Sequence, residues 1–345
     1  MQTLEASNPA ATAPQDPTKA RYVKSYAIRR AYSEEVQKPP NVPGVKDAID
    51  IHCHAHEGQQ DALSLAQHAS KQGMRGILYK TIVGRSNPVA AVQRVQEALN
   101  RWCEAEGVEP ITCWAGYNVA PTGKPPSAAE TRAQLEAGVV GVWMPVAMHA
   151  NTLHQVGGKP LWWGASKNPY EQVPPMPWDE ALRIGHYLLD EHGNLKPEIR
   201  EIIHMVADYG RTLFFAHATH PEIFAMAEEG NKVGLKQMVA DHPFSPFVDL
   251  SVEQMQELAG FGATMNFTFD ELSPLLGVDP FRMYQAIRAV GPEHCTLSSD
   301  AGEPLFPNSV ECMRLMRGYM RAFGLTEEEL QLMTTTTPAR LCGDQ

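Results

Sequence analysis

The sequence is short of basic residues and of long apolar runs. Its 345 residues hold 29 Lys and Arg against 40 Asp and Glu, a formal net charge of -11. Because there is no basic stripe to neutralise phosphates, we expect no nucleic-acid partner. No apolar run reaches the roughly 18 residues of a membrane-spanning helix, and the amino-terminus lacks the charged-then-apolar pattern of a secretory signal. We therefore expect no membrane association either.

Paired cysteines and a dinucleotide-binding glycine motif are also missing. The six cysteines are scattered without a CxxC pair, which is typical of reduced thiols in a cytoplasmic protein. No GxGxxG follows the first apolar run of the chain, which disfavours a dinucleotide-binding sheet. The remaining composition, 43% hydrophobic and 20% charged residues, is ordinary for a soluble enzyme with a sizeable core. The sequence thus predicts a cytoplasmic enzyme.

Three regions follow one another along the chain. Residues 1–19 are rich in Ala, Pro, Thr and Gln, which predicts a disordered tail. Residues 20–47 are expected to form a helical amino-terminal extension, broken by KPPNVPG before the first strand. Residues 48–345 alternate short apolar runs with amphipathic stretches, and they predict a single catalytic domain.

The apolar runs of this domain are the candidate strands. They read AIDIHCH, MRGILYK, ITCWAGYN, VVGVWMPV, TLFFAH, LKQMVADH, ATMNFTF and CTLSSD. Amphipathic stretches such as DALSLAQHASKQG, PVAAVQRVQEALNRWCEAEG and SVEQMQELAGFG separate them and end near a Gly, as a helix C-cap should. Helices of this length between strands imply parallel pairing through right-handed crossovers. The predicted fold class is α/β, a (β/α)8 TIM barrel, with an open doubly wound sheet as the alternative.

The connection between the fourth and fifth strands is unusually long, at about sixty residues, and long loops of compact domains are usually lids or binding loops. Its aromatic residues could roof an apolar or aromatic substrate, or they could bury a subunit interface in a homo-oligomer. They are Trp162, Trp163, Tyr170 and Trp178.

The segment DIHCHAH carries the first candidate metal ligands. Side chains at i and i+2 of a strand share a face, so His52 and His54 would point into the barrel while Cys53 points out. Two imidazoles on one rigid wall are a good start to a metal site. With 13 histidines in the chain, however, chance alone would produce an HxH in roughly every second such sequence.

Further candidate ligands end other predicted strands. His217 ends TLFFAH, His242 ends LKQMVADH and Asp300 ends CTLSSD. A TIM barrel gathers the carboxyl ends of its strands at one mouth, where its active site lies. Each residue alone could be a solvated loop residue, but together with the HxH pair they predict a metal site.

Lys80 ends the predicted strand MRGILYK and allows two interpretations. It is either an exposed lysine or a lysine that points into a desolvated mouth. A neutral amine in such a mouth could react with carbon dioxide to give a carbamate. That carbamate would bridge two divalent ions.

The order HxH, Lys, His, His, Asp on successive strand ends resembles the amidohydrolase superfamily, and the likeness runs from about residue 48 to residue 342. The stretches DIHCHAH, GILYKT, VVGVWMP, LLDEHGNLKPEIREII, VADHPF, LSSDAGEP and TPARLCG look like an uncharacterised, amidohydrolase-like bacterial subgroup. The resemblance implies an amidohydrolase-type barrel with one or two Zn2+ ions, for which Mn2+, Fe2+ or Ni2+ can substitute. It also implies hydrolysis at a C–N, C–O or P–O bond.

The resemblance also implies individual ligand roles. His52 and His54 match the first-strand ligands of the superfamily, His217 and His242 those of the fifth and sixth strands, and Asp300 the eighth-strand aspartate. In the common two-metal pattern a lysine or glutamate at the end of the fourth strand bridges the ions, but VVGVWMPV offers none. A bridge relocated to the lysine of the second strand is plausible, and the number of ions stays open.

Five residues beyond or near strand ends are candidates for substrate binding. Arg85 could pair with a substrate carboxylate bidentately. For the histidines of this set the alternative is a loop-anchoring role, and for the arginine a solvated surface position. The five are Arg85, Tyr117, Asn118, His149 and His220.

The mechanism expected from this site is metal-assisted hydrolysis. The ion would acidify a water and polarise the scissile carbonyl, while Asp300 would orient the water, take its proton and pass it to the leaving group. A small amide, lactam or cyclic imide fits a barrel mouth roofed by aromatic residues. The alternatives are a lactone, ester or phosphoester substrate, a metal-dependent decarboxylation, and a non-catalytic barrel that binds or assembles partners.

Overall fold

The structure is a computed structural model, and it describes residues 44–55, 61–82, 87–120, 124–158, 174–302 and 307–344. The predicted tail, and the predicted extension up to residue 43, lie outside these residues. So do Arg85, Trp162, Trp163 and Tyr170.

Eight parallel strands form one sheet, and their order along the sheet is their order along the chain. Each begins within or beside one of the predicted apolar runs. They are β1 (Ile49–Ala55), β2 (Gly76–Ile82), β3 (Thr112–Asn118), β4 (Gly141–Trp143), β5 (Thr212–Phe214), β6 (Met238–Asp241), β7 (Ala263–Thr268) and β8 (Cys295–Ser298).

The segment after β8 returns to β1 and brings the two ends of the sheet together. The amide of Asp300 donates to the carbonyl of His52, and the amide of His54 donates to the carbonyl of Ala301, each over 2.8 Å. Cys53 and Ala301 form a parallel bridge between these segments. The closed barrel predicted from the sequence is thus confirmed over the open sheet.

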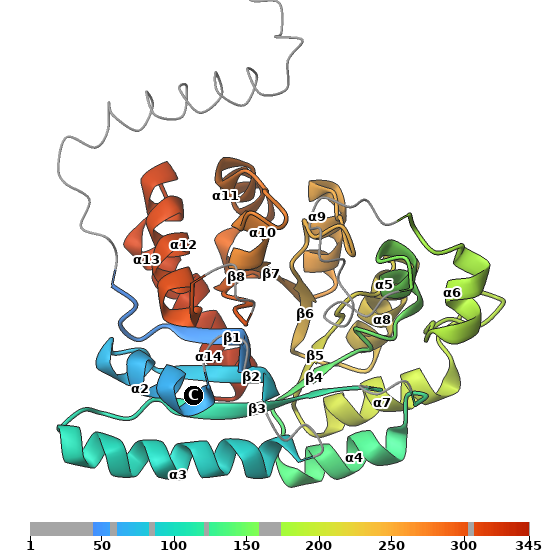
Figure 1. The fold of residues 1–345 in the computed structure, drawn as a ribbon. Helices are drawn as coiled ribbons and strands as arrows, with labels where there is room; N and C mark the ends of the chain where they lie inside the picture. The colour runs from blue at the N-terminus through green and yellow to red at the C-terminus, as the bar shows by residue number, and fades with distance from the viewer. Residues whose placement is uncertain are drawn as a thin grey trace, which may run out of the picture. The chain divides into compact units, whose positions relative to one another are not determined.

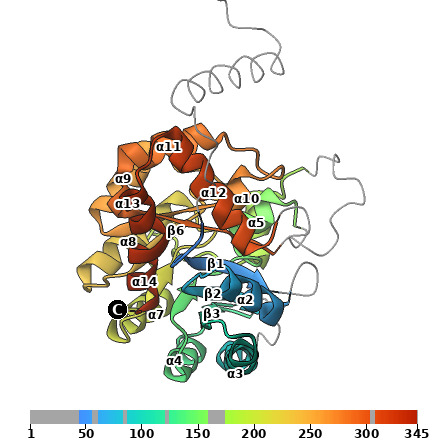
Figure 2. The same cartoon turned by 90° about the vertical axis from the view of Figure 1, so that its left-hand side faces the viewer.

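Helices fill the connections between the strands. In both views the strands lie between α3 and α4 on one side and α11 and α12 on the other (Figures 1 and 2). The helices are α2 (Ala62–Lys71), α3 (Pro88–Glu106), α4 (Ala128–Ala137), α5 (Ala150–Gln155), α6 (Trp178–Ile184), α7 (Pro197–Asp208), α8 (His220–Lys232), α9 (Val252–Gly260), α10 (Phe269–Leu272), α11 (Pro280–Val290), α12 (Ser309–Phe323), α13 (Glu327–Gln331) and α14 (Thr337–Cys342). None of the helices in the described ranges is long and apolar enough to cross a membrane.

Local sequence signals explain where the predicted helices begin and end. The side chain of Asp61 accepts from the amide of Ser64 at the start of α2, which satisfies one of the free amides of the first turn. Ser251 and Gln254 form a capping box at the start of α9. Gly107 ends α3 with a φ of 68°, a left-handed conformation that costs glycine little.

Two strand glycines make room for the largest ring of the core. Trp143 is fully buried and stacks on Phe214, with ring centroids 3.7 Å apart and an interplanar angle of 10°. A Cβ at Gly116 or Gly141 would lie 2.5 or 2.7 Å from the indole. These positions therefore accept only glycine, and the space they leave lets the indole lie across the barrel interior.

The long connection between β4 and β5 contains α5, α6 and α7. Its small apolar cluster is formed by Ala150, Leu153 and Ala181, which are buried. Trp178, the described one of the four predicted insertion aromatics, is 36% exposed. Its ring meets those of His154 and Tyr187 edge-on, so it packs against its own connection.

Candidate metal centre

The five predicted ligands lie at the carboxyl ends of four strands. His52 and His54 lie on β1, and Asp300 follows β8 by two residues. His242 directly follows β6, and His217 follows β5 by three residues. Because the strands are parallel and the sheet is closed, these positions share one mouth of the barrel.

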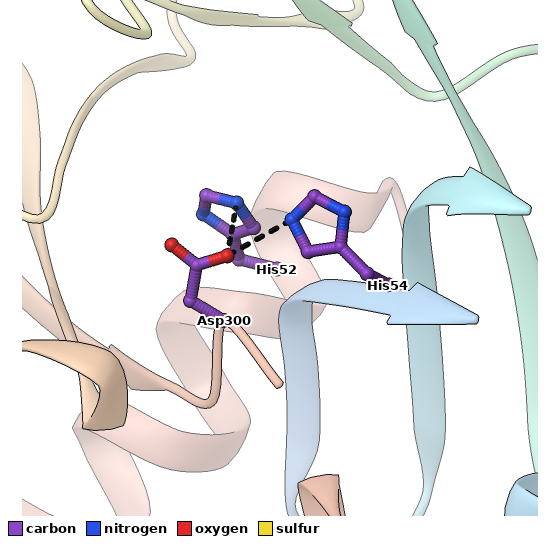
Figure 3. Close-up of side chains that lie close together, drawn as sticks. All are labelled: His52, His54 and Asp300. Atoms are coloured by element: carbon purple, nitrogen blue, oxygen red, sulfur yellow. Dashed lines mark hydrogen bonds and ion pairs between the residues drawn. The ribbon is translucent and has the colours of Figure 1, made fainter. Parts of the chain in front are cut away.

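Three of the five side chains converge on one point. The Oδ1 atom of Asp300 lies 3.1 Å from Nε2 of His52 and 2.9 Å from Nε2 of His54 (Figure 3). The ligand atoms of these three residues all lie within 4.8 Å of one another. Among the described residues they form the one such group of histidine, cysteine and acidic side chains.

The other two histidines extend this group rather than joining it. The ring of His242 lies 5.8 Å from that of His52 and 5.1 Å from that of His217, measured between centroids. Nε2 of His52 and Nδ1 of His242 are buried, and neither has a hydrogen-bond partner. Buried nitrogen atoms without a partner are costly unless a ligand binds them. The residues present therefore fit a metal ion of the type that nitrogen and oxygen ligands hold.

Protein partners hold the second ring nitrogen of three of these histidines. Nδ1 of His54 lies 2.5 Å from the hydroxyl of Thr81 on β2. Nδ1 of His217 lies 2.9 Å from the hydroxyl of Thr152 on α5. Nδ1 of His52 lies 3.0 Å from Oδ1 of Asp241 on β6. In each case Nε2 is the nitrogen left for a metal, and such partners orient metal-binding imidazoles.

The backbone is turned sharply where the ligands leave their strands. Asp300, His242 and Ala216, which precedes His217, have φ angles of 48°, 34° and 55°. Residues other than glycine avoid this left-handed region, and residues held in it cluster at functional sites. The strained backbone at these three positions thus coincides with the candidate ligands.

Lys80 lies within β2, two residues before its end, rather than at its end as predicted. The neighbouring Tyr79 donates to the carbonyl of Ala62 on α2, so strand alternation points Lys80 into the barrel. Lys80 is only 4% exposed. Among the described residues, none forms a hydrogen bond or ion pair with its ammonium group, although its charge influences the pKa of the ligands around it.

Two neighbouring carboxylates favour the protonated form of His52 in the metal-free protein. Burial opposes protonation of His52, but the charges of Asp300 and Asp241 outweigh it and raise its pKa to about 9. Burial likewise acts to raise the pKa of Asp300, yet the charge of His52 and the hydrogen bond from His54 hold this pKa well below its usual range. A divalent cation would replace the proton of His52 in this negative environment.

The remaining three histidines are held in the neutral form. Burial, opposed by Asp300, lowers the pKa of His54 to about 4. Burial also lowers the pKa of His242 to about 4, and that of His217 falls well below its usual value for the same reason. Neutral imidazoles are the form that binds metal.

A second acidic residue at the mouth was missed by sequence reasoning. Thr268 of β7 pairs with Ser298 of β8, and Asp270 and Asp300 each follow these residues by two positions. The hydroxyl of Thr268 donates to Asp270 over 2.8 Å. Burial, and then the charge of Asp300, raises the pKa of Asp270 to about 7, against a smaller opposing effect of His52. A carboxylate two residues beyond a strand end was the signal available in the sequence.

Of two predicted substrate contacts on β3, Tyr117 points away from this centre and Asn118 lies beside it. Tyr117 is 4% exposed, and burial and Glu130 of α4 raise the pKa of its phenol, which places the hydroxyl on the helix side of β3. Asn118, the next residue, donates from Nδ2 to the carbonyl of Lys80, and its Oδ1 is buried without a partner. Its amide is therefore next to the lysine of the mouth.

The predicted contacts His149 and His220 have both ring nitrogens engaged by protein atoms. His149 is fully buried; its Nε2 lies 3.0 Å from Glu222, and its Nδ1 accepts from the amide of Asn151. His220 lies 2.6 Å from the carbonyl of Val248 and 3.2 Å from the amide group of Gln254. Their contacts in the structure are with loops and helices of the barrel.

Comparison with known proteins identifies the family of the chain and shows which solved structures share its fold. A family described as "Family of unknown function (DUF6282)" matches residues 47–266. No curated protein matches the chain. An amidohydrolase from Pseudomonas aeruginosa is 12% identical over 92% of this chain and 98% of its own, with a TM-score of 0.56. An Agrobacterium tumefaciens protein is 12% identical over 88% and 98%, with a TM-score of 0.51.

A further likeness is to a structure in which organophosphate hydrolysis was engineered from a weak, promiscuous lactonase. It is 17% identical over 86% of this chain and 95% of its own, with a TM-score of 0.51. At such identities these likenesses establish the fold alone, and they confirm the predicted amidohydrolase type of barrel. The family match spans both first-strand histidines, Lys80, His217 and His242, and Asp300 lies beyond it. The chain belongs to this family of unknown function, and its fold is the amidohydrolase-type (β/α)8 barrel.

Proposed function

We propose that the protein is a metal-dependent hydrolase that cleaves the C–N bond of a small amide, lactam or cyclic imide. The observation that carries this proposal is the convergence of His52, His54 and Asp300 on one point at the mouth of the barrel, where the buried Nε2 of His52 faces Asp300 and makes no hydrogen bond. Zn2+ suits two imidazoles and a carboxylate, and Mn2+, Fe2+ or Ni2+ could take its place. His242 and His217 extend the ligand set.

A divalent cation at this point would supply acidity to a water and polarise the scissile carbonyl. Asp300 would receive the proton of the attacking water, a role that its ionised carboxylate beside the imidazoles supports. Its Oδ2 atom has no part in the two contacts through Oδ1 and is the oxygen that would take this proton. Asp300 would then return the proton to the leaving nitrogen.

The second part of the proposal concerns Lys80 and a second ion. Its amine nitrogen would bond to the carbon of carbon dioxide and release one proton to solvent, giving a carbamate that bridges two cations. Its burial and the lack of any ion-pair partner among the described residues support this role, since a buried ammonium group without a counter-ion is costly. Asn118, next to it, would contact the substrate through its free Oδ1.

Metal content and a substrate panel test the proposal together. Protein purified without chelator is analysed for metals, then assayed with Zn2+, Mn2+, Fe2+ and Ni2+ on amides, lactams, cyclic imides, esters, lactones and phosphotriesters. We expect about one or two ions per chain and the highest kcat/KM on a C–N substrate. Preference for a lactone, ester or phosphoester would contradict the proposed C–N substrate but would leave the proposed metal site unaffected. Less than about 0.2 ion per chain together with no turnover would favour the non-catalytic binding or assembly barrel.

The bridging role of Lys80 is tested by chemical rescue. Lys80→Ala should lose most activity and about half of the bound metal of a two-ion site, and short carboxylic acids should restore part of the rate by replacing the carbamate. A surface control is Lys236→Ala, which removes an exposed lysine outside the mouth. Full metal content and rate in Lys80→Ala would refute the bridge without affecting the histidine site.

A further inference from the structure

A fully buried carboxylate, Asp241, lies directly behind the candidate metal centre at the end of β6. Its Oδ1 lies 3.0 Å from Nδ1 of His52 on β1 and accepts from Nδ2 of Asn266 on β7 over 2.8 Å. Its Oδ2 accepts from the indole N–H of Trp143 on β4 over 2.8 Å. One side chain thus joins the four strands β1, β4, β6 and β7 inside the barrel.

The neighbours of Asp241 are donors by chemistry or by their own hydrogen bonds. An indole nitrogen can only donate. The Oδ1 atom of Asn266 accepts from the hydroxyl of Ser298, which turns its NH2 group toward Asp241. A site surrounded by donors is satisfied by an ionised carboxylate, so the third neighbour, Nδ1 of His52, also carries a proton and donates.

This arrangement decides which nitrogen of His52 is free. A neutral imidazole protonated at Nδ1 has its lone pair at Nε2, the atom that lies 3.1 Å from Asp300 and lacks a hydrogen-bond partner. We propose that Asp241 is a positioning residue that fixes His52 as the Nδ1–H tautomer and aims Nε2 at the metal ion. The inference rests on the proposed function, because it assigns the orientation of one ligand of that same site.

Trp143 and Asn266 extend the positioning role to the carboxylate itself. The indole is fixed by its stack on Phe214 and by the glycines beneath it, so its N–H cannot move away from Oδ2. With both oxygens bound, the carboxylate cannot rotate, and the ring of His52 is held in one plane. The metal site therefore depends on a buried polar network that crosses the barrel interior from β4 to β1.

Zn2+ affinity and the tautomer of His52 test the proposal by separate measurements. Asp241→Asn keeps the shape but presents an NH2 group to at least one donor, and we expect Zn2+ affinity, measured by competition with a chelator, to fall about 10- to 100-fold. The tautomer is read by NMR of 15N-histidine-labelled, metal-free protein above pH 9, with His52→Gln to assign the signal. The native ring should carry its proton on Nδ1, and the variant should shift toward Nε2–H.

Controls separate positioning from general destabilisation. Glu222→Gln disturbs a second fully buried histidine–carboxylate pair, 3.0 Å long, that touches no proposed ligand, and it should leave Zn2+ affinity per folded chain unchanged. If Asp241→Asn fails to fold, Trp143→Phe removes the indole donor while keeping an aromatic ring, and it should still weaken Zn2+ binding several-fold.

Three results would overturn the proposal: native Zn2+ affinity in the folded Asp241 or Trp143 variant, an equal loss in Glu222→Gln, or a native His52 protonated on Nε2. A native protein that binds none of Zn2+, Mn2+, Fe2+ and Ni2+ would instead refute the metal-dependent function. The NMR measurement would still decide the tautomer, so the two failures are distinguishable.

Discussion

Two histidine–carboxylate pairs of the barrel look alike and differ in one nitrogen. His52 with Asp241 and His149 with Glu222 are all fully buried, and in each pair the nitrogen and oxygen lie 3.0 Å apart. Nδ1 of His149 accepts from the amide of Asn151 and so begins α5, which leaves neither of its nitrogens free. Nε2 of His52 has no hydrogen-bond partner.

The tautomers of the two rings are therefore opposite. His149 donates from Nε2 and accepts at Nδ1, whereas His52 in its neutral form donates from Nδ1 and carries its lone pair at Nε2. Glu222 also accepts from the amide of Leu188 and from Thr219, so that pair joins three backbone segments. A buried histidine–carboxylate pair is thus no sign of function by itself. The unsatisfied atom on its far side is the informative feature.

The largest expected contrast is between the two alanine variants. His52→Ala should lose nearly all bound metal and turnover while remaining folded. His149→Ala should keep metal per folded chain but lose about 3–5 kcal/mol of stability, because Glu222 is left charged and buried without its partner. Metal analysis and chemical unfolding of both variants check this, and metal loss in His149→Ala would erase the distinction between the pairs.

Asp300 is the residue beside His52 that has no counterpart beside His149. Asp300→Asn keeps the shape and one oxygen ligand but removes the proton acceptor, and we expect turnover to fall about a hundredfold to ten-thousandfold. Metal occupancy should fall much less, because the imidazoles remain. Steady-state kinetics on the substrate found in the panel, with metal analysis alongside, measures both. Near-native turnover would assign the proton transfer to another residue, and Asp270 would be tested next.

The pH dependence of stability reports on the His52–Asp241 pair in the metal-free protein. The pKa of His52 is raised to about 9, so its proton stabilises the fold fully below about pH 6.5, and this stability is lost as the pH rises toward 9. The pKa of Asp241 is lowered to about 2, so its contribution is present above about pH 4 and is lost as the pH falls toward 2. Thermal unfolding in chelator should show a falling midpoint between pH 6.5 and 9. The same slope in His52→Gln would show that other groups cause it.

The smallest effect is expected from the loss of the contact between Thr152 and the imidazole of His217. Thr152→Val removes the hydroxyl that lies 2.9 Å from Nδ1 of His217 and keeps the shape, at a cost of about 1 kcal/mol. Zn2+ affinity should therefore fall about fivefold. Thr131→Val is the matched control, since it removes a buried hydroxyl that donates to the carbonyl of Ser127 at the start of α4. Equal Zn2+ affinities in the two variants would show that orientation of His217 is unimportant.

The barrel and the mouth were predictable from the sequence because both follow from the order of the strands. Apolar runs separated by helices imply parallel strands, and parallel strands in a closed barrel bring His52, His217, His242 and Asp300 to one end. No contact between distant residues needed to be known. The same reasoning placed Tyr117 near the mouth, but β3 runs on to Asn118, so alternation directs the tyrosine toward α4.

The residues behind the ligands were not predictable in this way. Asp241 looked like a flank of His242, and its role exists only because β6, β1 and β4 face one another across the barrel interior. Trp143 and Asn266 looked like ordinary members of apolar strands. One signal was present: an acidic residue inside the buried run MVADH has to find donors, because burial of an unpaired charge is prohibitive.

The helix α5 limits how this barrel can be re-engineered. Its Asn151 donates to the carbonyls of His217 and Phe247, over 3.0 and 2.6 Å, and Thr152 meets the imidazole of His217 itself. A chimera that received an unrelated connection directly after β4 would lose this support along with any substrate contacts it was meant to change. Exchange of the connection for a new specificity has to begin after Gln155, so that α5 with Asn151 and Thr152 is kept from the parent chain.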